Sequence, residues 1–478
     1  MDVTFAAEGR AEVAAVLAYE DDIAFPLEDG MLRAAAAMRG FGGAAGECAD
    51  IVVAAKEGVR RFVLLGAGSR TAFAPDAAEE TGRRLARVVG LAGRCLDVHG
   101  LCSPELAARF AFGVLAETYR DDRYKTTTAA PLAPASVNVV TTDPDGWAPA
   151  FAGMPALAEG VAIARDLANA PPNRMTPSLF AAYCTGLQIA GLDVAVLDRD
   201  ALAALGMGAL LGVGQGSAAP PCVVILRWSG RGGGAPLIFA GKGVTFDSGG
   251  LLPKPAEEMW DMKYDRAGAA AVVGAMVALA RKQVPVDVVA VLGLVENMPS
   301  GSAQRPGDVV TSHSGQTIEV LHTDAEGRLL LADLLSYARS RFSPAAILDI
   351  ATLTGGLTSV LTDRYAGLYA NDEVLASALA DAGEACGERI WRLPLNDAFD
   401  RMIDSPVADM QNICKQRWGG TATAAQFLKR FVGDTPWAHL DIFGPAWNHG
   451  ASGPHGATGY GVRLLTGLAD VWSRRSVA

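Results

Sequence analysis

The stretch PLIFAGKGVTFDSGG (residues 236–250) joins an apolar run to a lysine, an aspartate and a pair of glycines. Because residues 237–240 are apolar in succession, they predict a strand in a sheet that is covered on both faces. Similar runs alternate with helical patterns at CVVILRW (222–228), PVDVVAVLGLVEN (285–297) and AAILDIATLTG (345–355). The sequence therefore predicts an α/β fold with a mixed, mostly parallel sheet covered by helices.

The length of the chain predicts more than one domain. Single hydrophobic cores stop growing near ~250–300 residues, and this chain has 478. The N-terminal part also alternates strands and helices, as in RRFVLLGAG (60–68), and a looser segment rich in Pro, Thr and Asp follows at 126–147. We expect a smaller N-terminal α/β domain over residues 1–145 and a larger C-terminal α/β domain over residues 146–478.

Composition and charge narrow the possible partners and location. The formal net charge of -11 and the lack of clustered Lys and Arg argue against a nucleic-acid partner. No uncharged apolar stretch reaches the ~20 residues that a membrane helix needs, so no membrane partner is expected. The N-terminal stretch carries acids where a signal peptide would be basic, and the seven cysteines form no C-x-x-C pair. These features predict a cytoplasmic protein.

The stretch HTDAEGRLLLADLL (322–335) places charged residues directly before an apolar helical pattern. A helix that is apolar over most of its circumference is normally buried, and ions at its start persist only if they are paired or bound to a metal. In an extended segment, Asp324, Glu326 and Arg328 project from the same side and can converge on one point. A solvated charge run is the simpler interpretation, but the buried helix favours a site.

Two further acids and two lysines complete this candidate site. Taken singly, Asp247 is a turn former, Asp265 a helix cap, and Lys242 and Lys254 surface lysines. Together with Asp324 and Glu326, however, the two aspartates provide a formal charge of about -4, which matches two divalent cations. Such a centre ionises a bridging water and polarises the group that the water attacks. Lys242 is then a candidate neutral amine ligand, and Lys254 a candidate cation that stabilises an oxyanion.

The segments GKGVTFDSGG, MKYDRAGAA and TDAEGRLLLADLL, in that order, resemble the signature segments of the leucyl aminopeptidase (cytosol aminopeptidase) family. The resemblance covers roughly residues 160–465. It implies a metal-dependent enzyme that releases leucine and other N-terminal residues from peptides with a free N-terminus. By resemblance, Asp247 and Glu326 bridge two metal ions, Lys242 and Asp265 complete one site, and Asp324 completes the other.

The same resemblance assigns the remaining roles. Lys254 and Arg328 form the catalytic pair, with Arg328 holding a bicarbonate ion that acts as general base. The substrate is held by Met262, which the residue pattern alone would place in the core, and by main-chain groups of Thr352, Leu353 and Gly355. Mn or Zn are the expected metals, with Mg or Co as further possibilities, and the family implies a homohexamer. The alternatives are another binuclear metal hydrolase, such as a phosphoesterase, and a secondary DNA-binding or regulatory role.

Two positions depart from the family pattern. His322 stands where the family usually has Asn, and Arg266 where Met commonly follows the metal-binding Asp. The simpler interpretation places His322 beside the metals, where it alters their affinity or the pH dependence. The alternative makes His322 a metal ligand or a contact of the departing residue. For Arg266 we expect a salt bridge rather than a contact with substrate.

Overall fold

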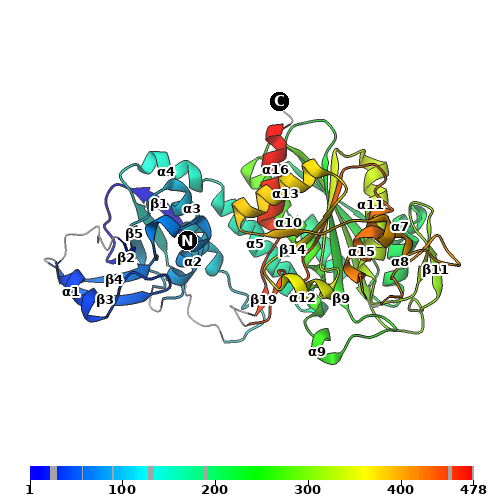
Figure 1. The fold of residues 1–478 in the computed structure, drawn as a ribbon, viewed down its shortest axis with the longest axis horizontal. Helices are drawn as coiled ribbons and strands as arrows, with labels where there is room; N and C mark the ends of the chain where they lie inside the picture. Colours follow the sequence, from blue (N-terminus) through cyan, green and yellow to red (C-terminus); the bar gives the residue numbers. More distant parts are fainter. Residues whose placement is uncertain are drawn as a thin grey trace. The chain divides into compact units, whose positions relative to one another are not determined.

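The structure is a computed structural model that describes residues 1–21, 30–55, 58–88, 91–127, 134–187, 189, 191–416, 418–450 and 455–475. The chain divides into two compact units, Met1–Ala158 and Glu159–Ala478. Figure 1 shows unit 1 in blue and cyan and unit 2 in green to red. The domain division expected from the sequence, between residues 145 and 146, stays a prediction.

Unit 1 is built on a six-stranded sheet in the order β1-β6-β5-β2-β4-β3, parallel except for the antiparallel edge pair β3 and β4. Its strands are β1 (Asp2–Ala6), β2 (Val13–Ala18), β3 (Cys48–Ala55), β4 (Gly58–Gly66), β5 (Cys95–His99) and β6 (Ser136–Val140). Its helices are α1 (Gly30–Met38), α2 (Pro75–Ala86), α3 (Pro104–Glu117) and α4 (Pro144–Phe151). Separate apolar clusters lie on the two faces of the sheet, as the consecutive apolar residues of β2 require.

Unit 2 is built on an eight-stranded mixed sheet in the order β15-β14-β17-β13-β9-β10-β8-β7. Its strands are β7 (Leu192–Leu197), β8 (Cys222–Ser229), β9 (Leu237–Asp247), β10 (Asp287–Asn297), β13 (Ala346–Ala351), β14 (Ala366–Ala370), β15 (Ile390–Arg392) and β17 (Trp437–Asp441). The pairs β9–β10, β9–β13 and β13–β17 are parallel. The expected fold class, an α/β sheet that is mixed and mostly parallel, is confirmed.

Helices cover both faces of this sheet, with α10, α13 and α16 on one side and α8, α11 and α15 on the other (Figure 1). The helices are α5 (Met154–Asn169), α6 (Pro177–Thr185), α7 (Arg199–Ala204), α8 (Gly208–Gly214), α9 (Ala256–Met259), α10 (Ala267–Lys282), α11 (Gly327–Phe342), α12 (Thr358–Leu361), α13 (Glu373–Cys386), α14 (Asp397–Arg401), α15 (Gly420–Lys429) and α16 (Val462–Arg475). Among the described residues, no helix has the length and apolar character needed to cross a membrane.

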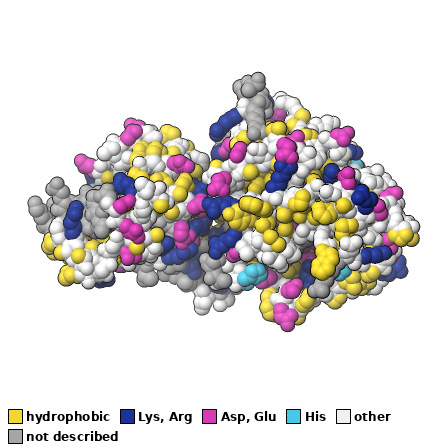
Figure 2. Space-filling model, in the orientation of Figure 1, with side chains coloured by type: hydrophobic (Ala, Val, Ile, Leu, Met, Phe, Trp, Pro, Cys, Tyr) yellow, Lys and Arg dark blue, Asp and Glu magenta, His cyan; other side chains and the backbone are white. Residues whose placement is uncertain are grey.

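Smaller elements surround the main sheet. They are the three-stranded sheet of β11 (Asp308–Thr311), β12 (Thr317–Val320) and β16 (Met410–Gln411), and the hairpin of β18 (Trp447–Asn448) and β19 (Gly456–Ala457). Two short 3-10 turns lie next to helices: η3 (Met262–Arg266) connects α9 to α10, and η4 (Gly355–Leu357) lies between β13 and α12. On the face of the molecule shown in Figure 2, acidic and basic side chains are interspersed.

Helix α10 packs unusually close to its neighbours because it presents glycines to them. A Cβ on Gly268 would lie 2.2 Å from the carbonyl oxygen of Ile350 in β13, and one on Gly274 would lie 2.3 Å from that of Gly160 in α5. Real Cβ atoms do not approach carbonyl oxygens so closely. Main-chain atoms therefore set the spacing of α10 from β13 at Gly268 and from α5 at Gly274. The turn η3, which immediately precedes α10, packs on β9.

Candidate metal centre

Polar side chains line one edge of the unit 2 sheet, where its central parallel strands end. Asp247 ends β9 and pairs in register with Asn297, which ends β10. On the other side of β9, Ala351 ends β13 and pairs with Asp441, which ends β17. Ligands of open α/β sheets bind at this carboxyl edge. The fold therefore collects its polar groups where a ligand is expected.

Lys242 lies within β9 and is almost fully buried. Its ammonium group is 2.8 Å from Asp265 Oδ1 and 2.8 Å from Glu326 Oε1, and it donates a 2.8 Å hydrogen bond to the carbonyl of Thr352. Burial lowers the pKa of Lys242, but the negative charges of Asp265 and Glu326 outweigh burial and raise that pKa above its ordinary value. The structure thus joins four of the predicted site residues at one point.

A bulge in β9 decides which way Asp247 faces. Residues five apart in a regular strand point to opposite faces of a sheet, which would separate Asp247 from Lys242. The register with β10 shifts after Val244, so Thr245 is the extra residue of a bulge. The bulge returns Asp247 to the side of Lys242, where its carboxylate, that of Asp265 and that of Glu326 offer ligand atoms within 4.8 Å of one another.

Lys254 pairs with the other two acids of the predicted set. Its ammonium group is 2.8 Å from Asp247 Oδ2 and 2.6 Å from Asp324 Oδ1. Asn297 donates a 2.8 Å hydrogen bond to Asp247 Oδ1 and so fixes the rotamer of that carboxylate. All four predicted carboxylates and both predicted lysines therefore lie in one cluster, which we call the carboxylate cluster.

The electrostatics of the carboxylate cluster favour additional positive charge. Burial, reinforced by the charge of Glu326, raises the pKa of Asp247 to about 7. Burial also raises the pKa of Asp265 well above its usual range. Within the described residues, the buried Oδ2 of Asp265 has no hydrogen-bond partner. Buried carboxylates that repel one another and leave an oxygen unpaired are a donor set that fits divalent cations.

Arg328 lies in the first turn of α11, two residues after Glu326, the N-cap residue of this buried helix. Its guanidinium donates a 2.8 Å hydrogen bond to the carbonyl of Asn412, while its buried Nε has no partner among the described residues. Burial lowers the pKa of Arg328 to about 10, which leaves it charged near neutral pH. Arg328 therefore offers a buried N–H donor to an anion.

Asn412, which the sequence did not single out, holds the loop that leads into α11. Its Oδ1 accepts from the amide of Leu321 at 2.8 Å, and its Nδ2 donates to the carbonyl of His322 at 2.7 Å. The ring of His322 accepts a 3.2 Å hydrogen bond from the amide of Asp324. His322 thus lies beside the carboxylate cluster and orients the segment that carries Asp324, a placement that favours the simpler of its two interpretations.

The four expected substrate residues lie on two segments of this site. Met262 is buried in η3, the turn that also carries Asp265. The segment after β13 runs from Thr352 to Gly355, the first residue of η4. Asp441 accepts the amide of Leu353 at 3.1 Å and holds the segment in place. Both Asn297 and Asp441 were missed from the sequence, although each ends a strand next to one that carries a predicted residue.

Arg266 plays a structural role. It is fully buried, and its guanidinium donates to the carbonyls of Leu167 at 2.8 Å and Thr245 at 2.7 Å, with a further bond to that of Met175 at 3.3 Å. The expected salt bridge stays a prediction. These hydrogen bonds tie η3 to the end of α5 and to the bulge of β9.

Replacing Arg266 by Ala should therefore destabilise the protein by about 3–5 kcal/mol, since it leaves a cavity and several buried carbonyls without donors. Urea denaturation of the variant measures this loss. Arg174→Ala, which removes an exposed arginine, serves as the control and should change stability by less than ~0.5 kcal/mol. Equal midpoints for the two variants would show that the buried bonds contribute nothing.

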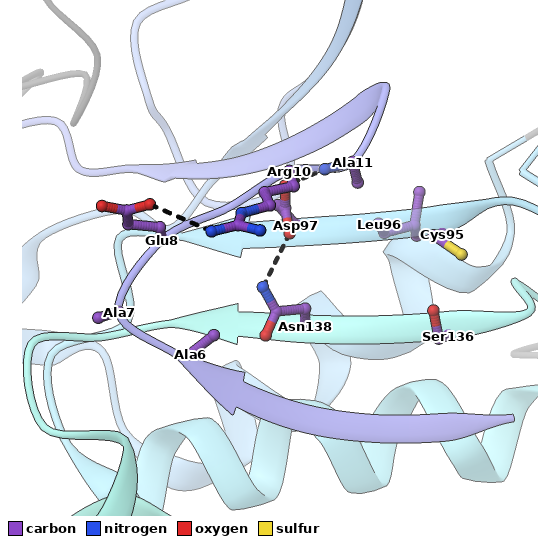
Figure 3. Close-up of a pocket in the computed structure, with 10 residues that line it drawn as sticks. All are labelled: Ala6, Ala7, Glu8, Arg10, Ala11, Cys95, Leu96, Asp97, Ser136 and Asn138. Carbon is purple, nitrogen blue, oxygen red and sulfur yellow. Dashed lines mark hydrogen bonds and ion pairs between the residues drawn. The ribbon is translucent and has the colours of Figure 1, made fainter.

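Unit 1 carries a hollow of about 620 Å³ (Figure 3). Its most buried polar group, Asp97, accepts from the amide of Ala11 at 2.6 Å and from Asn138 Nδ2 at 2.8 Å. These bonds link the loop after β1 to β5 and β6. These hydrogen bonds account structurally for Asp97 and Asn138.

The fold and the carboxylate cluster define a metal-dependent enzyme of the α/β class. Residues 162–466 match the model of the cytosol aminopeptidase family, catalytic domain, and residues 15–128 match that of its N-terminal domain. The chain belongs to the cytosol aminopeptidase family, and the predicted metal-dependent aminopeptidase is confirmed.

Three relatives illustrate the match. A probable cytosol aminopeptidase of Brucella melitensis is 47% identical over 440 residues, which cover 90% of each chain. One of Caulobacter vibrioides is 45% identical over 480 residues, which cover 97% of each. Among solved structures, the bottromycin maturation enzyme BotP in complex with Mn superposes with a TM-score of 0.87 at 36% identity, over 97% of this chain and 100% of that one.

Proposed function

We propose that the carboxylate cluster holds two divalent ions and that unit 2 releases leucine and other N-terminal residues from peptides with a free N-terminus. Asp247 and Glu326 would bridge the ions, with Lys242 and Asp265 on one side and Asp324 on the other. The observation that carries this proposal is the convergence of buried ligand atoms from Asp247, Asp265 and Glu326 within 4.8 Å. Oδ2 of Asp265, which has no hydrogen-bond partner within the described part of the chain, supports it.

We propose Mn or Zn as the ions, with Mg or Co as alternatives, because carboxylate ligands accept all of these. The BotP structure, which contains Mn, supports manganese. When bound, the ions would activate a water and bind the free α-amine of the substrate, which accounts for selectivity toward the first residue. Lys242 must lose a proton to serve as a ligand, and the arriving cations favour this loss.

Lys254 would polarise the scissile carbonyl and stabilise the tetrahedral intermediate. Burial lowers the pKa of Lys254, but the charges of Asp247 and Glu326 outweigh that effect and raise it above the ordinary value. The ammonium group is therefore charged at neutral pH, as an oxyanion stabiliser must be. Arg328, through its unpaired Nε, would hold a bicarbonate ion and so place a proton acceptor beside the scissile bond.

The substrate would lie along the segment after β13, with its first side chain toward Met262. The amide of Leu353 already donates to Asp441, and the carbonyl of Thr352 already accepts from Lys242. The carbonyl of Gly355 likewise accepts from Thr358 Oγ1 at 2.7 Å. We therefore assign the carbonyl of Leu353 and the amide of Gly355 as the groups that contact a peptide. The homohexamer, the cytoplasmic location and the absence of membrane and nucleic-acid partners stay part of this proposal.

Hydrolysis of leucine p-nitroanilide by the purified chain tests the proposed function. Activity should vanish when a chelator removes the metal, and return on addition of Mn, Zn or Co. The N-acetylated substrate should remain intact under the same conditions, because its blocked nitrogen cannot bind a metal as a free amine does. A metal-loaded protein that cleaves both substrates equally, or neither, would contradict the proposal.

A further inference from the structure

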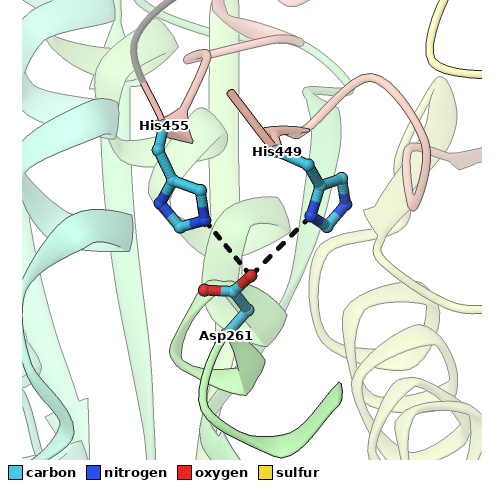
Figure 4. A group of neighbouring side chains, drawn as sticks. All are labelled: Asp261, His449 and His455. Carbon is cyan, nitrogen blue, oxygen red and sulfur yellow. Dashed lines mark ion pairs between the residues drawn. The ribbon is translucent and has the colours of Figure 1, made fainter. Parts of the chain in front are cut away.

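A second group of possible metal ligands lies outside the carboxylate cluster. Asp261, His449 and His455 come from two separate loops of unit 2, and both imidazole rings point toward the same carboxylate oxygen (Figure 4). Their ligand atoms all lie within 4.8 Å of one another. We propose that these residues, the histidine cluster, form an accessory site for one divalent transition-metal ion of the zinc type.

The distances within the histidine cluster are close to those between ligands of one ion. His455 Nε2 is 3.4 Å and His449 Nδ1 is 3.7 Å from Asp261 Oδ2. Both distances exceed the ~3.2 Å limit of ordinary N–H···O hydrogen bonds. Zinc binds nitrogen and oxygen at about 2.0–2.2 Å, so neighbouring ligand atoms in a tetrahedral site lie about 3.3–3.6 Å apart. The three side chains therefore leave room for an ion between them.

The chain brings the two histidines together through a hairpin. His449 follows β18 directly and His455 precedes β19 directly, and these strands pair antiparallel. Trp447 of β18 packs on η3, with its ring 5.3 Å from that of Tyr264 and 5.5 Å from the ammonium group of Lys263. Strand β18, which directly precedes His449, thus packs against the turn that Asp261 caps.

The chemistry of this cluster differs from that of the carboxylate cluster. Two imidazoles and one carboxylate suit Zn²⁺, Ni²⁺, Co²⁺ or Cu²⁺, whereas an oxygen-rich site accepts Mn²⁺ and Mg²⁺ more readily. The side chains of His449 and His455 are 69% and 52% exposed, so an ion reaches them directly from solvent. Three protein ligands leave a fourth position for water. A bound ion would tie the hairpin to the residue that precedes Met262.

Metal counting on the full chain tests the accessory site. Chains are first saturated with Mn²⁺, then equilibrated with Co²⁺, desalted and analysed for both metals. The wild type should retain about one more Co²⁺ per chain than His449→Gln or His455→Gln. It should also show the intense visible absorption of tetrahedral Co²⁺, and the variants should lose that absorption.

The control variant is Glu258→Gln, which removes an acidic charge from the exposed helix α9 close in sequence to Asp261. It should retain the additional ion, because it changes local charge without removing a ligand. Equal Co²⁺ content and equal spectra in the wild type and both histidine variants would overturn the proposal. The Co²⁺ count depends on neither Lys254 nor peptide hydrolysis, so its outcome is independent of the proposed function.

A second measurement needs no variant and so remains decisive if a substitution prevents folding. Diethyl pyrocarbonate modifies exposed histidines, and mass spectrometry locates the modified residues. Saturating Zn²⁺ should protect His449 and His455 together, whereas Mg²⁺ at the same concentration should protect neither. Unchanged modification of both residues in Zn²⁺ would rule out the site.

Discussion

Glu326→Gln is expected to lower kcat/KM by about 10³-fold or more and to reduce the bound metal by about one ion per chain. Glu326 is buried, its Oε1 lies 2.8 Å from Lys242, and the charges of Lys242 and Lys254 oppose burial and hold its pKa below the usual range. Glutamine removes this negative charge and directs either a neutral oxygen or an N–H group at the proposed ions. Metal analysis and steady-state kinetics on the same preparation measure both losses.

Glu296→Gln is the matched control for this experiment. Glu296 is a half-buried glutamate at the end of β10, where it accepts a hydrogen bond from Ser217. Its replacement should leave the metal content unchanged and alter kcat/KM by less than ~10-fold. If Glu326→Gln instead retained both ions and most of its activity, the bridging role assigned to Glu326 would be wrong.

Lys254→Gln is expected to lower kcat by about 10²–10³-fold, the range found when one oxyanion donor is removed. In this variant the metal should be retained or held more tightly. Lys254 contacts Asp247 and Asp324 at 2.8 and 2.6 Å, and loss of its charge leaves these acids free to attract cations. KM should change much less than kcat, because the proposed contact strengthens as the carbonyl oxygen becomes negative.

Lys415→Gln, which neutralises an exposed lysine, controls for the change in net charge and should behave as the wild type. Loss of metal in Lys254→Gln would indicate that the lysine acts in assembly of the site. A rise in KM at constant kcat would indicate ordinary substrate binding. Either result would contradict the role of Lys254 in stabilising the intermediate.

The parts of the site that the sequence predicted are those encoded locally. Asp324, Glu326 and Arg328 lie within one short motif, and the apolar pattern after them correctly predicts the buried helix α11. The strand over 236–243 was equally predictable, because consecutive apolar residues identify a sheet covered on both faces. In both segments the spacing of apolar residues along the sequence determines the secondary structure, and residues distant in sequence change it little.

Other features depend on tertiary structure and have no local pattern. Strand alternation alone would place Lys242 and Asp247 on opposite faces, and only the bulge at Thr245 brings them together. Asn297 and Asp441 act because their strands end beside β9 and β13, an order that requires the sheet topology. Of the six histidines, only His322 lies close in sequence to the acids of the carboxylate cluster. His449 and His455 are distant in sequence from Asp261, and only the fold brings the three together.

The glycines of α10 limit how this enzyme can vary. Where side chains separate a helix from its neighbours, a change of rotamer absorbs a small displacement. At Gly268 and Gly274, however, α10 touches main-chain atoms of β13 and α5, and no side chain is present to adjust. One added methyl group at either glycine would displace the whole helix from its neighbours. This displacement would change how far Asp265 extends into the carboxylate cluster. Substrate preference can therefore change through substitutions in the loops around Met262. The distances between the ligands of the carboxylate cluster, in contrast, are fixed by the backbone.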